Sequence, residues 1–489
     1  MLRRRLPSSF AVAALISACL IGSASPVVYA QSTEAERIAR DPEVLGATRL
    51  FVAWLEGQIL NRHLPGVAVG VVSDQDLIWA RGFGLADTSA KIAMTPATKF
   101  RMASHSKLFT ATAVMQLREQ GKLRLDDPVS KHLPWFQVKP ADPDDPPITI
   151  EELLTHSSGL PREAGSHWTT FEFPTTDELR GLMAERQAPF SPDVRWKYSN
   201  LAFSIAGLIV EAVSGQPYGD YVSQHIYQPL GMSSSSVDQD APGLAVGYGR
   251  WTPEGTRAVN PFIDARGMAA ATGITSTVDD MAKFVSAQFR KGPAGGNRIL
   301  STGSLRDMHR VRVLENNWTQ GNAIGFAVRR TGDKTFVSHG GSYPGYQTQT
   351  MLQLDGKVGV IVLTNADDGN PGGIATQLMN TVGEAVAKAA TAGSSPTITW
   401  DPAWSRFAGL YKGRGAETQV VELNRRLVVI TPSAANLDNP IRLEPIGNDQ
   451  FRYVAPTGGG PVGEIVRFVE EGGRVVRMFT GDSYVDRVR

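Results

Sequence analysis

The sequence predicts a protein of the α/β class, more narrowly α+β, in which an antiparallel sheet flanked by helices, with an added helical region, precedes a small all-β barrel. Three observations predict it. A hairpin pattern opens the main region at residues 67–80, and buried strands with a closing helix end it at residues 351–389. Helical patterns fill the stretch between. Beyond a small-residue linker the pattern changes to short, regularly spaced strands. The 489 residues are enough for two or three domains.

Residues 1–30 have the pattern of a signal peptide. Three arginines at positions 3–5 precede an apolar stretch from Phe10 to Ile21, and small residues end at Ala30. Signal peptidase accepts small residues three and one before the cut. We therefore expect cleavage after Ala30 and a periplasmic or secreted protein. An uncleaved anchor helix is the alternative.

Cys19 is the only cysteine of the chain and lies within this segment. The residues before it, Ile16-Ser17-Ala18, resemble a lipoprotein box, so processing there would leave Cys19 carrying a lipid anchor. With cleavage after Ala30 the mature chain has no disulfide and no thiol nucleophile. No later stretch approaches the roughly 20 apolar residues of a membrane span, so we expect no transmembrane helix in the mature chain.

The main region, expected over residues 31–390, starts with an amphipathic helix near residues 47–60. The apolar runs Val67–Val72 and Leu77–Ala80 are joined by a polar turn, which predicts a hairpin. A helix is expected from Ser104 to Glu119, because Gly121 stops it. The other elements expected here are helices at 150–155, 201–213, 278–289 and 374–389 and strands at 351–354 and 358–364.

Residues 391–398 read as a linker of small residues. Residues 399–489 follow with short alternating strands and turn signals such as Gly472-Gly473, which favour a small antiparallel barrel or sandwich. The strands expected are 419–423, 427–430, 442–445, 450–453, 465–468 and 475–479.

The composition excludes some function classes. A formal charge of +1 gives no basic excess for nucleic acid. The apolar fraction of 42% and the charged fraction of 20% are those of a soluble globular protein. The histidines are scattered without metal-ligand spacing, so no metal and no cofactor are expected.

The segment Ser104-His105-Ser106-Lys107 carries the first chemical signal. At the start of a helix, residues three apart share a face, so the hydroxyl of Ser104 and the amine of Lys107 can meet. A serine hydroxyl needs a base to become a nucleophile, and a lysine serves as base when burial or positive charge lowers its pKa. Alone, this spacing occurs often in solvated helices.

Two further segments strengthen the interpretation. Tyr198-Ser199-Asn200 lies before an apolar helix, and His339-Gly340-Gly341-Ser342 lies just ahead of an apolar strand region. The glycine pair would let the backbone approach a ligand closely. The pattern Gly340-Gly341-Ser342-Tyr343-Pro344 ends in proline where the nucleophile elbow of α/β-hydrolases needs glycine, so a Ser-His-Asp enzyme is disfavoured.

These three motifs, in this order, resemble those of penicillin-recognising enzymes. Further similar segments are Leu125–Val129, Leu153–Pro161, Thr272–Met281 and Leu363–Asn365, so the resemblance spans about residues 65–389. The chain is thus similar to the serine beta-lactamase and penicillin-binding-protein-like hydrolases, on the class C, peptidase S12-type branch. The resemblance implies a beta-lactamase/transpeptidase-like fold.

The resemblance also implies roles for individual residues. Ser104 would be acylated, Lys107 would help remove its proton, and Tyr198 would relay protons to the leaving group. The remaining roles concern substrate: Asn200 would hold substrate or Lys107, Gly341 would allow close approach, the N–H groups of Ser104 and Ser342 would form the oxyanion hole, and His339 would take the place of the usual cation. His156, in a Thr-His-Ser-Ser-Gly segment, is interpreted as a loop brace.

The third motif limits how far the substrate can be inferred. Beta-lactamases of this kind carry Lys-Thr-Gly, which captures a carboxylate, whereas this chain has His339 and Gly340. A histidine is less certain to be charged. We therefore expect an exported serine hydrolase that cleaves amide bonds of small or D-amino-acid-containing peptides, resembling D-peptidases and the hydrolase of linearised microcystin.

Three alternatives stay open. A carboxylesterase comes second, because esterases of the family share the Gly-Gly pair. A beta-lactamase or D-Ala-D-Ala carboxypeptidase comes third, and a non-enzymatic binder of peptidoglycan fragments is the remaining one. The segment Phe407–Tyr411 resembles the start of a lipocalin-like barrel appended to several such enzymes. The expected partner is a small peptide or ester substrate, and the oligomeric state is open.

Overall fold

The computed structural model describes most of the chain, in nine stretches. They are residues 33–237, 242–290, 299–315, 317–394, 400–415, 417–422, 425–430, 441–454 and 460–488. The expected signal peptide at 1–30, the lipid-anchor alternative at Cys19 and residues 395–398 of the expected linker lie outside the described residues.

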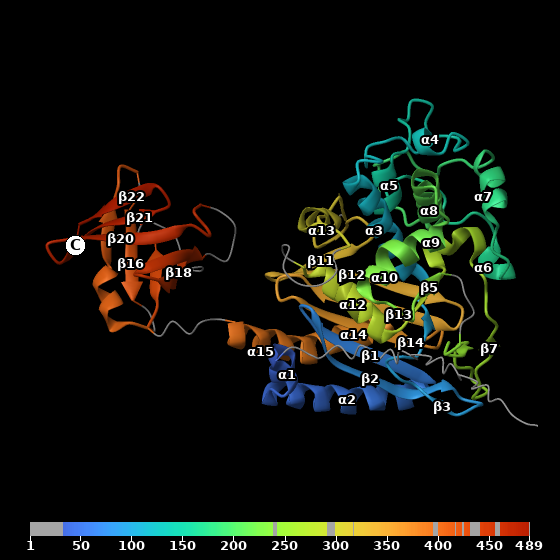
Figure 1. Cartoon of the computed structure of the whole chain (residues 1–489), viewed down its shortest axis with the longest axis horizontal. Helices are drawn as coiled ribbons and strands as arrows, with labels where there is room; N and C mark the ends of the chain where they lie inside the picture. Colours follow the sequence, from blue (N-terminus) through green and yellow to red (C-terminus); the bar gives the residue numbers. More distant parts are fainter. Residues whose placement is uncertain are drawn as a thin grey trace, which may run out of the picture.

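A nine-stranded antiparallel sheet forms the centre of the main region (Figure 1), in the order β3-β2-β1-β14-β13-β12-β11-β10-β9. Its strands are β1 (Gly66–Ser73), β2 (Asp76–Asp87), β3 (Ile92–Ala93), β9 (Val313–Leu314), β10 (Gln320–Asn322), β11 (Ala327–Thr331), β12 (Lys334–Tyr343), β13 (Tyr346–Gln353) and β14 (Val358–Thr364). Val67 in β1 lies opposite Thr364 in β14. The two ends of the main region therefore meet in one sheet, as the sequence predicted.

Both faces of the central strands are buried, because their side chains alternate between two cores. Val67 and Val69 of β1, with Val360 and Val362 of β14, belong to the core on one face. Their neighbours, such as Ala68, belong to the core on the other face. This two-sided burial explains why both strands read as continuous apolar runs.

One face of the sheet is covered by helices from the two ends of the main region (Figure 1). They are α1 (Thr33–Ala39), α2 (Pro42–Arg62), α14 (Pro371–Leu378), the π-helical turn η4 (Met379–Gly383) and α15 (Glu384–Ser394). Asp41 caps α2 by accepting a hydrogen bond from the N–H of Glu43, at 2.9 Å. The helix expected at 374–389 is thus three consecutive segments.

The helical region covers the opposite face and projects beyond it (Figure 1). Its elements are η1 (Ala103–His105), α3 (Ser106–Glu119), α4 (Val129–His132), α5 (Ile150–Thr155), α6 (His167–Thr170), α7 (Thr176–Met183), α8 (Asn200–Ser214), α9 (Tyr218–Val222), η2 (Ser223–Tyr227), α10 (Gln228–Leu230), η3 (Arg266–Met268), α11 (Ala269–Thr272), α12 (Val278–Gln288) and α13 (Thr302–His309). Five short strands lie among them, β4 (Phe100–Arg101), β5 (Ser236–Val237), β6 (Gly247–Tyr248), β7 (Val259–Asn260) and β8 (Ile274–Ser276).

The C-terminal strands form a closed antiparallel barrel, which decides between the two architectures that the sequence allowed. They are β15 (Gly409–Lys412), β16 (Glu417–Glu422), β17 (Leu427–Ile430), β18 (Ile441–Gly447), β19 (Gln450–Val454), β20 (Ile465–Glu471), β21 (Arg474–Thr480) and β22 (Ser483–Arg487), preceded by the 3₁₀ segment η5 (Pro402–Phe407). The barrel has its own apolar core, with Phe407, Tyr411 and Phe451 among its members. In Figure 1 it lies beyond the end of α15, away from the sheet.

Most expected elements are present, with two differences that matter here. α15 ends at Ser394, so it extends into the expected linker at 391–398. α3 begins at Ser106, and Ser104 lies in the 3₁₀ turn η1 just before it. Within the described residues, every helix is too short or too polar to cross a bilayer.

Candidate active site

Ser104 lies at the centre of η1, where β4 turns into α3. The preceding residue, Ala103, has a φ of 52°, in the left-handed region that alanine rarely adopts. Ser106 fixes this turn, because its hydroxyl donates to the carbonyl oxygen of Ala103 at 2.7 Å and accepts from the N–H of Ile274 at 3.0 Å. Ser104 is the only residue between 101 and 110 that is not fully buried. The strained turn therefore presents one hydroxyl to solvent.

Lys107 lies beneath Ser104 and is itself buried. Its Nζ lies 3.1 Å from Ser104 Oγ, 2.7 Å from Asn200 Oδ1 and 2.9 Å from the carbonyl oxygen of Ala271. Burial holds the pKa of Lys107 well below its usual value, while the carboxylate of Glu163 raises that pKa in part. The neutral amine that a general base requires is therefore favoured.

Tyr198 approaches Ser104 from the loop before α8, and its hydroxyl lies 2.8 Å from Ser104 Oγ. Ser199 orders this loop, because its hydroxyl caps α8 by accepting from the N–H of Ala202, at 2.9 Å. His156 accepts a hydrogen bond from the N–H of Ser199 through Nδ1, at 3.1 Å, and its ring lies 4.3 Å from that of Tyr198. These contacts are those of the loop brace expected for His156.

Burial raises the pKa of Tyr198 to about 12, although its hydrogen bond to Ser104 lowers that pKa in part. The phenol is therefore protonated at neutral pH. The protonated phenol of Tyr198 can donate its proton to a departing group. It can accept a proton only after it has lost the phenolic one.

Asn200 connects Lys107 to a carboxylate that the sequence analysis did not single out. Its Oδ1 faces Lys107, and its Nδ2 donates to Glu163 Oε1 at 2.7 Å. Glu163 also contacts His167, whose Nε2 lies 3.1 Å from Oε2. Burial raises the pKa of Glu163. Hydrogen bonds to Glu163, the largest contribution coming from His167, outweigh the effect of burial and leave this pKa below its usual value. Glu163 is thus an anion two hydrogen bonds away from Lys107.

Strand β12 passes over η1 and forms the opposite wall. A Cβ on Gly341 would collide with the carbonyl oxygen of Met102 and with Thr348 Oγ1, so only glycine allows β12 to lie this close to η1. Ser342 follows on the same strand, opposite Gln347 of β13. This close approach brings the backbone of Ser342 to the same pocket as Ser104.

His339 is also on β12 but does not line the pocket. Its Nδ1 lies 2.7 Å from the carbonyl oxygen of Gly340, and its ring lies 6.0 Å from that of the buried His105. Burial lowers the pKa of His339 to about 4, and the charge of Lys107 adds to this effect. The imidazole is therefore neutral at pH 7 and supplies no cation for a substrate carboxylate.

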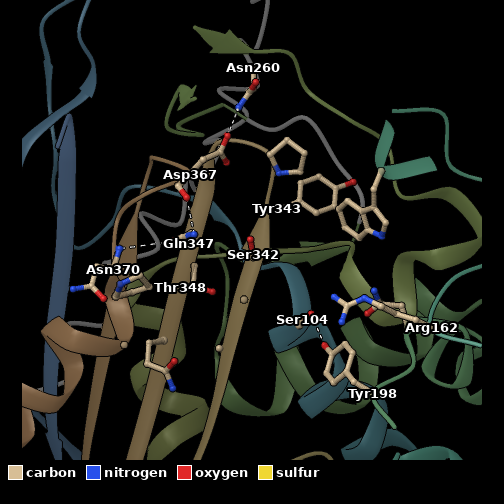
Figure 2. Close-up of a pocket in the computed structure, with 18 of the residues that line it drawn as sticks. Ser104, Arg162, Tyr198, Asn260, Ser342, Tyr343, Gln347, Thr348, Asp367 and Asn370 are labelled. Atoms are coloured by element: carbon tan, nitrogen blue, oxygen red, sulfur yellow. Dashed lines mark hydrogen bonds between the residues drawn. The ribbon is translucent and has the colours of Figure 1, made fainter. Parts of the chain in front are cut away.

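A pocket of about 890 Å³ opens above Ser104. Five of the seven expected site residues line it: Ser104, Tyr198, Asn200, Gly341 and Ser342. Figure 2 shows Ser104, Tyr198 and Arg162 at one end and Asp367, Gln347, Asn370 and Asn260 at the other, with Ser342 between. Aromatic side chains, Trp168, Phe171, Trp196 and Tyr343, supply much of the remaining wall. Lys107 reaches Ser104 from beneath.

Comparison with known families assigns the main region. The sequence model of the family named Beta-lactamase matches residues 38–379, about two thirds of the chain. This chain belongs to the beta-lactamase family. The family consists of serine hydrolases and their penicillin-binding relatives, and the match covers every residue of the site described above.

Two related sequences illustrate the similarity of this beta-lactamase family member to known proteins. It is 31% identical over 301 residues to the putative penicillin-binding protein PbpX of Bacillus subtilis (strain 168). The matched residues cover 60% of this chain and 69% of PbpX. It is 27% identical over 318 residues to protein flp of Staphylococcus aureus (strain MRSA252), which covers 64% of this chain. The matched part spans 61% of the length of flp.

Solved structures extend the likeness to the fold. The octameric penicillin-binding protein homologue from Pyrococcus abyssi matches with a TM-score of 0.60 and 25% identity, over 90% of this chain and 99% of that one. A D-stereospecific amidohydrolase from Streptomyces sp. matches with a TM-score of 0.54 and 22% identity, over 69% of this chain and 97% of that one. The hydrolase EstCE1 matches with a TM-score of 0.58 and 24% identity, over 72% and 100%. The last two share the fold.

Proposed function

We propose that this beta-lactamase family member is an exported serine hydrolase that cleaves amide bonds of small or D-amino-acid-containing peptides through an acyl-enzyme on Ser104. The observation that carries this proposal is the position of Ser104 Oγ, 3.1 Å from Lys107 Nζ and 2.8 Å from the hydroxyl of Tyr198. A candidate base and a candidate proton relay are thus both within hydrogen-bond reach of the candidate nucleophile.

In the acylation step, Ser104 Oγ adds to the carbonyl carbon of the scissile amide while its proton passes to Lys107 Nζ. In this proposal the N–H groups of Ser104 and Ser342 stabilise the oxyanion, a contribution of roughly 3–4 kcal/mol where one such donor has been removed from an enzyme. Tyr198 gives its proton to the departing amine as the C–N bond breaks, and the proton on Lys107 replaces it. The result is an ester on Ser104 and a free amine.

Deacylation reverses these roles. A water molecule adds to the ester carbonyl and loses a proton to the Lys107–Tyr198 pair. That proton returns to Ser104 Oγ as the C–O bond breaks and the carboxylic acid leaves. Neither step needs a metal or a redox cofactor, because proton transfer and the oxyanion hole suffice.

The residue at the usual position of the carboxylate-binding cation supports peptides over beta-lactams and C-terminal carboxypeptidase substrates. Those compounds present a carboxylate, and the neutral His339 offers it no cation. Hydrolysis of carboxylic esters is the second candidate function. The aromatic wall of Trp168, Phe171 and Trp196 favours it, because apolar acyl groups pack well against such rings.

Labelling tests the proposal and separates it from a non-enzymatic binder. Purified protein is treated with a fluorophosphonate or penicillin probe and digested, and the adduct is located by mass spectrometry. We expect one adduct on Ser104, and a chain without an adduct there would contradict the enzyme assignment. D-amino-acid peptides should then exceed short p-nitrophenyl esters in kcat/KM, and the reverse ranking would favour the esterase.

Export is a separate part of the proposal. The basic, apolar and small-residue pattern of residues 1–30 supports a periplasmic or secreted location. The mass of the mature protein purified from cells tests it. A chain starting at Gln31 supports signal peptidase cleavage, a lipid on Cys19 supports the anchor, and an intact N-terminus contradicts both.

A further inference from the structure

The end of the pocket farthest from Ser104 carries a carboxylate, Asp367 (Figure 2). It lies just after β14, and two hydrogen bonds orient its side chain. The N–H of Gly345 donates to Oδ1 at 2.6 Å, and Asn260 Nδ2 lies 3.3 Å from Oδ2. Each oxygen can accept further hydrogen bonds, because among the described residues it accepts the one just given.

The backbone around Asp367 is held firmly by β13. Gln347 Nε2 donates to the carbonyl oxygen of Asp367 at 2.7 Å, and Gln347 Oε1 accepts from the N–H of Asn370 at 3.2 Å. The carboxylate is therefore placed by a strand of the central sheet. Such fixed placement is what a recognition site needs, because little ordering remains to be done on binding.

Asp367 makes no ion pair with any Lys, Arg or His of the described stretches. Its neighbour Asp368 differs: it pairs with Arg257 Nη1 at 2.6 Å and does not line the pocket. Among the described residues that line the pocket, the one basic side chain is Arg162, at the opposite end, where its guanidinium lies 5.1 Å from the ring of Tyr198. The pocket thus has a negative end and a positive end, and the negative end holds an unpaired charge.

We propose that Asp367 binds an ammonium group of the substrate, so that the enzyme selects small peptides or amides with a free amine at this end of the pocket. This inference rests on the function proposed above and names its substrate class. A partly buried carboxylate forms charge-assisted hydrogen bonds with an ammonium group and repels a carboxylate. The neighbouring amides of Asn260 and Gln347 add polar surface that suits a peptide backbone.

The experiment uses matched substrates in two series. In the first series, the acyl part of a small amide carries an amine that is free, acetylated or succinylated, and the free amine is present as an ammonium group. In the other, the same three groups are on the amine part. Turnover is followed by chromatography for the wild type, for Asp367→Asn and for Asp333→Asn. Asp333 lies in the exposed turn between β11 and β12, so its variant controls for the change in net charge.

In one of the two series the wild type should prefer the ammonium substrate to the acetylated one by about tenfold in kcat/KM, with the succinylated one lowest. Asp367→Asn should reduce this ratio to about one, whereas Asp333→Asn should retain it. An unchanged ratio in Asp367→Asn, or no ammonium preference in either series of the wild type, would overturn the inference. In that case Ser104-dependent turnover would still support the proposed function.

Binding to Ser104→Ala makes the inference testable without turnover. Calorimetry should show about tenfold tighter binding of the ammonium compounds than of the acetylated ones, and the double variant with Asp367→Asn should lose the difference. Equal affinities in both proteins would contradict recognition by Asp367. If the wild type neither labels nor turns over, the function proposed for Ser104 fails while this binding result still decides the inference. Thermal unfolding of Asp367→Asn checks that the loop is intact.

Discussion

Asn200 places its side-chain oxygen 2.7 Å from Lys107 Nζ and its side-chain nitrogen 2.7 Å from Glu163. One amide therefore links the candidate base to a partly buried anion. Because Oδ1 can only accept and Nδ2 can only donate, the amide has a single productive orientation. The charge on Lys107 is thus coupled through Asn200 to Glu163, which does not line the pocket.

Replacement of Ser104 should abolish the reaction without unfolding the protein. Ser104→Ala removes one partly exposed hydroxyl, so turnover should fall more than a hundredfold while the melting temperature changes little. Hydrolysis is compared with circular dichroism melts. Residual turnover above about a hundredth of the wild type would indicate another nucleophile.

Replacement of Lys107 should prevent acylation itself. In Lys107→Ala no amine faces Ser104 Oγ, so labelling by a fluorophosphonate probe should be lost. Tyr198→Phe retains the amine of Lys107. Relative to the wild type, this variant should lose more of its amide turnover than of its labelling rate, because the leaving amine then lacks its proton donor. Lys107→Ala that labels at the wild-type rate would show that Lys107 is not the base.

Glu163 and Arg162 should shift the acidic limb of the pH profile in opposite directions. Glu163 raises the pKa of Lys107 and Arg162 lowers it. Glu163→Gln should therefore move the acidic limb of kcat/KM to lower pH, because more of Lys107 stays neutral there. Arg162→Gln should move it to higher pH. Shifts of both variants in the same direction would contradict titration of Lys107 as the origin of that limb.

His309 should make the protein less stable in acid. Burial lowers its pKa from 6.5 to about 4, so between these values the unfolded chain binds a proton that the folded one does not. The free energy of unfolding therefore falls as pH falls from 6.5 towards 4. In His309→Gln the drop in melting temperature between pH 7 and pH 5 should be a few degrees smaller than in the wild type. The exposed His63→Gln serves as control, and equal drops in all three proteins would contradict this assignment.

The barrel should be dispensable for acylation. All described residues of the pocket lie between positions 104 and 372, and the barrel has its own core. A chain ending at Ser394 should therefore label at Ser104 within about twofold of the full-length rate. Loss of labelling in a truncated chain that still melts cooperatively would show that the barrel supports the site.

The sequence predicted best those elements whose burial is uniform. β14 and α5 have the expected bounds, because Val358–Thr364 is an unbroken apolar run and Thr149 begins α5 with a capping box. β12 was harder to recognise. Lys334–Tyr343 is mostly polar with two glycines, and it becomes a strand because it pairs with β11 and β13.

The motifs identified Ser104, Lys107 and Tyr198, and the structure added Glu163 and Asp367 around them. Ser104, Lys107 and Tyr198 share a known spacing, so the sequence could place them together. Glu163 has no such signature, because its partner Asn200 lies 37 residues away and the contact depends on the loop between them. Asp367 follows a strand end that the sequence predicts. The sequence does not show whether the charge of Asp367 is paired, because this depends on which residues surround it in the folded pocket.

The pairing of β1 with β14 has a consequence for the order in which the chain takes shape. The middle of the sheet can form only after Thr364, the partner of Val67, has been synthesised about 300 residues later. At roughly 5–20 residues per second on the ribosome, this wait lasts about 15–60 s. The first hairpin must remain unpaired on one edge during that time, exposed to aggregation. The barrel, built from neighbouring hairpins, can complete itself soon after its last strand is synthesised.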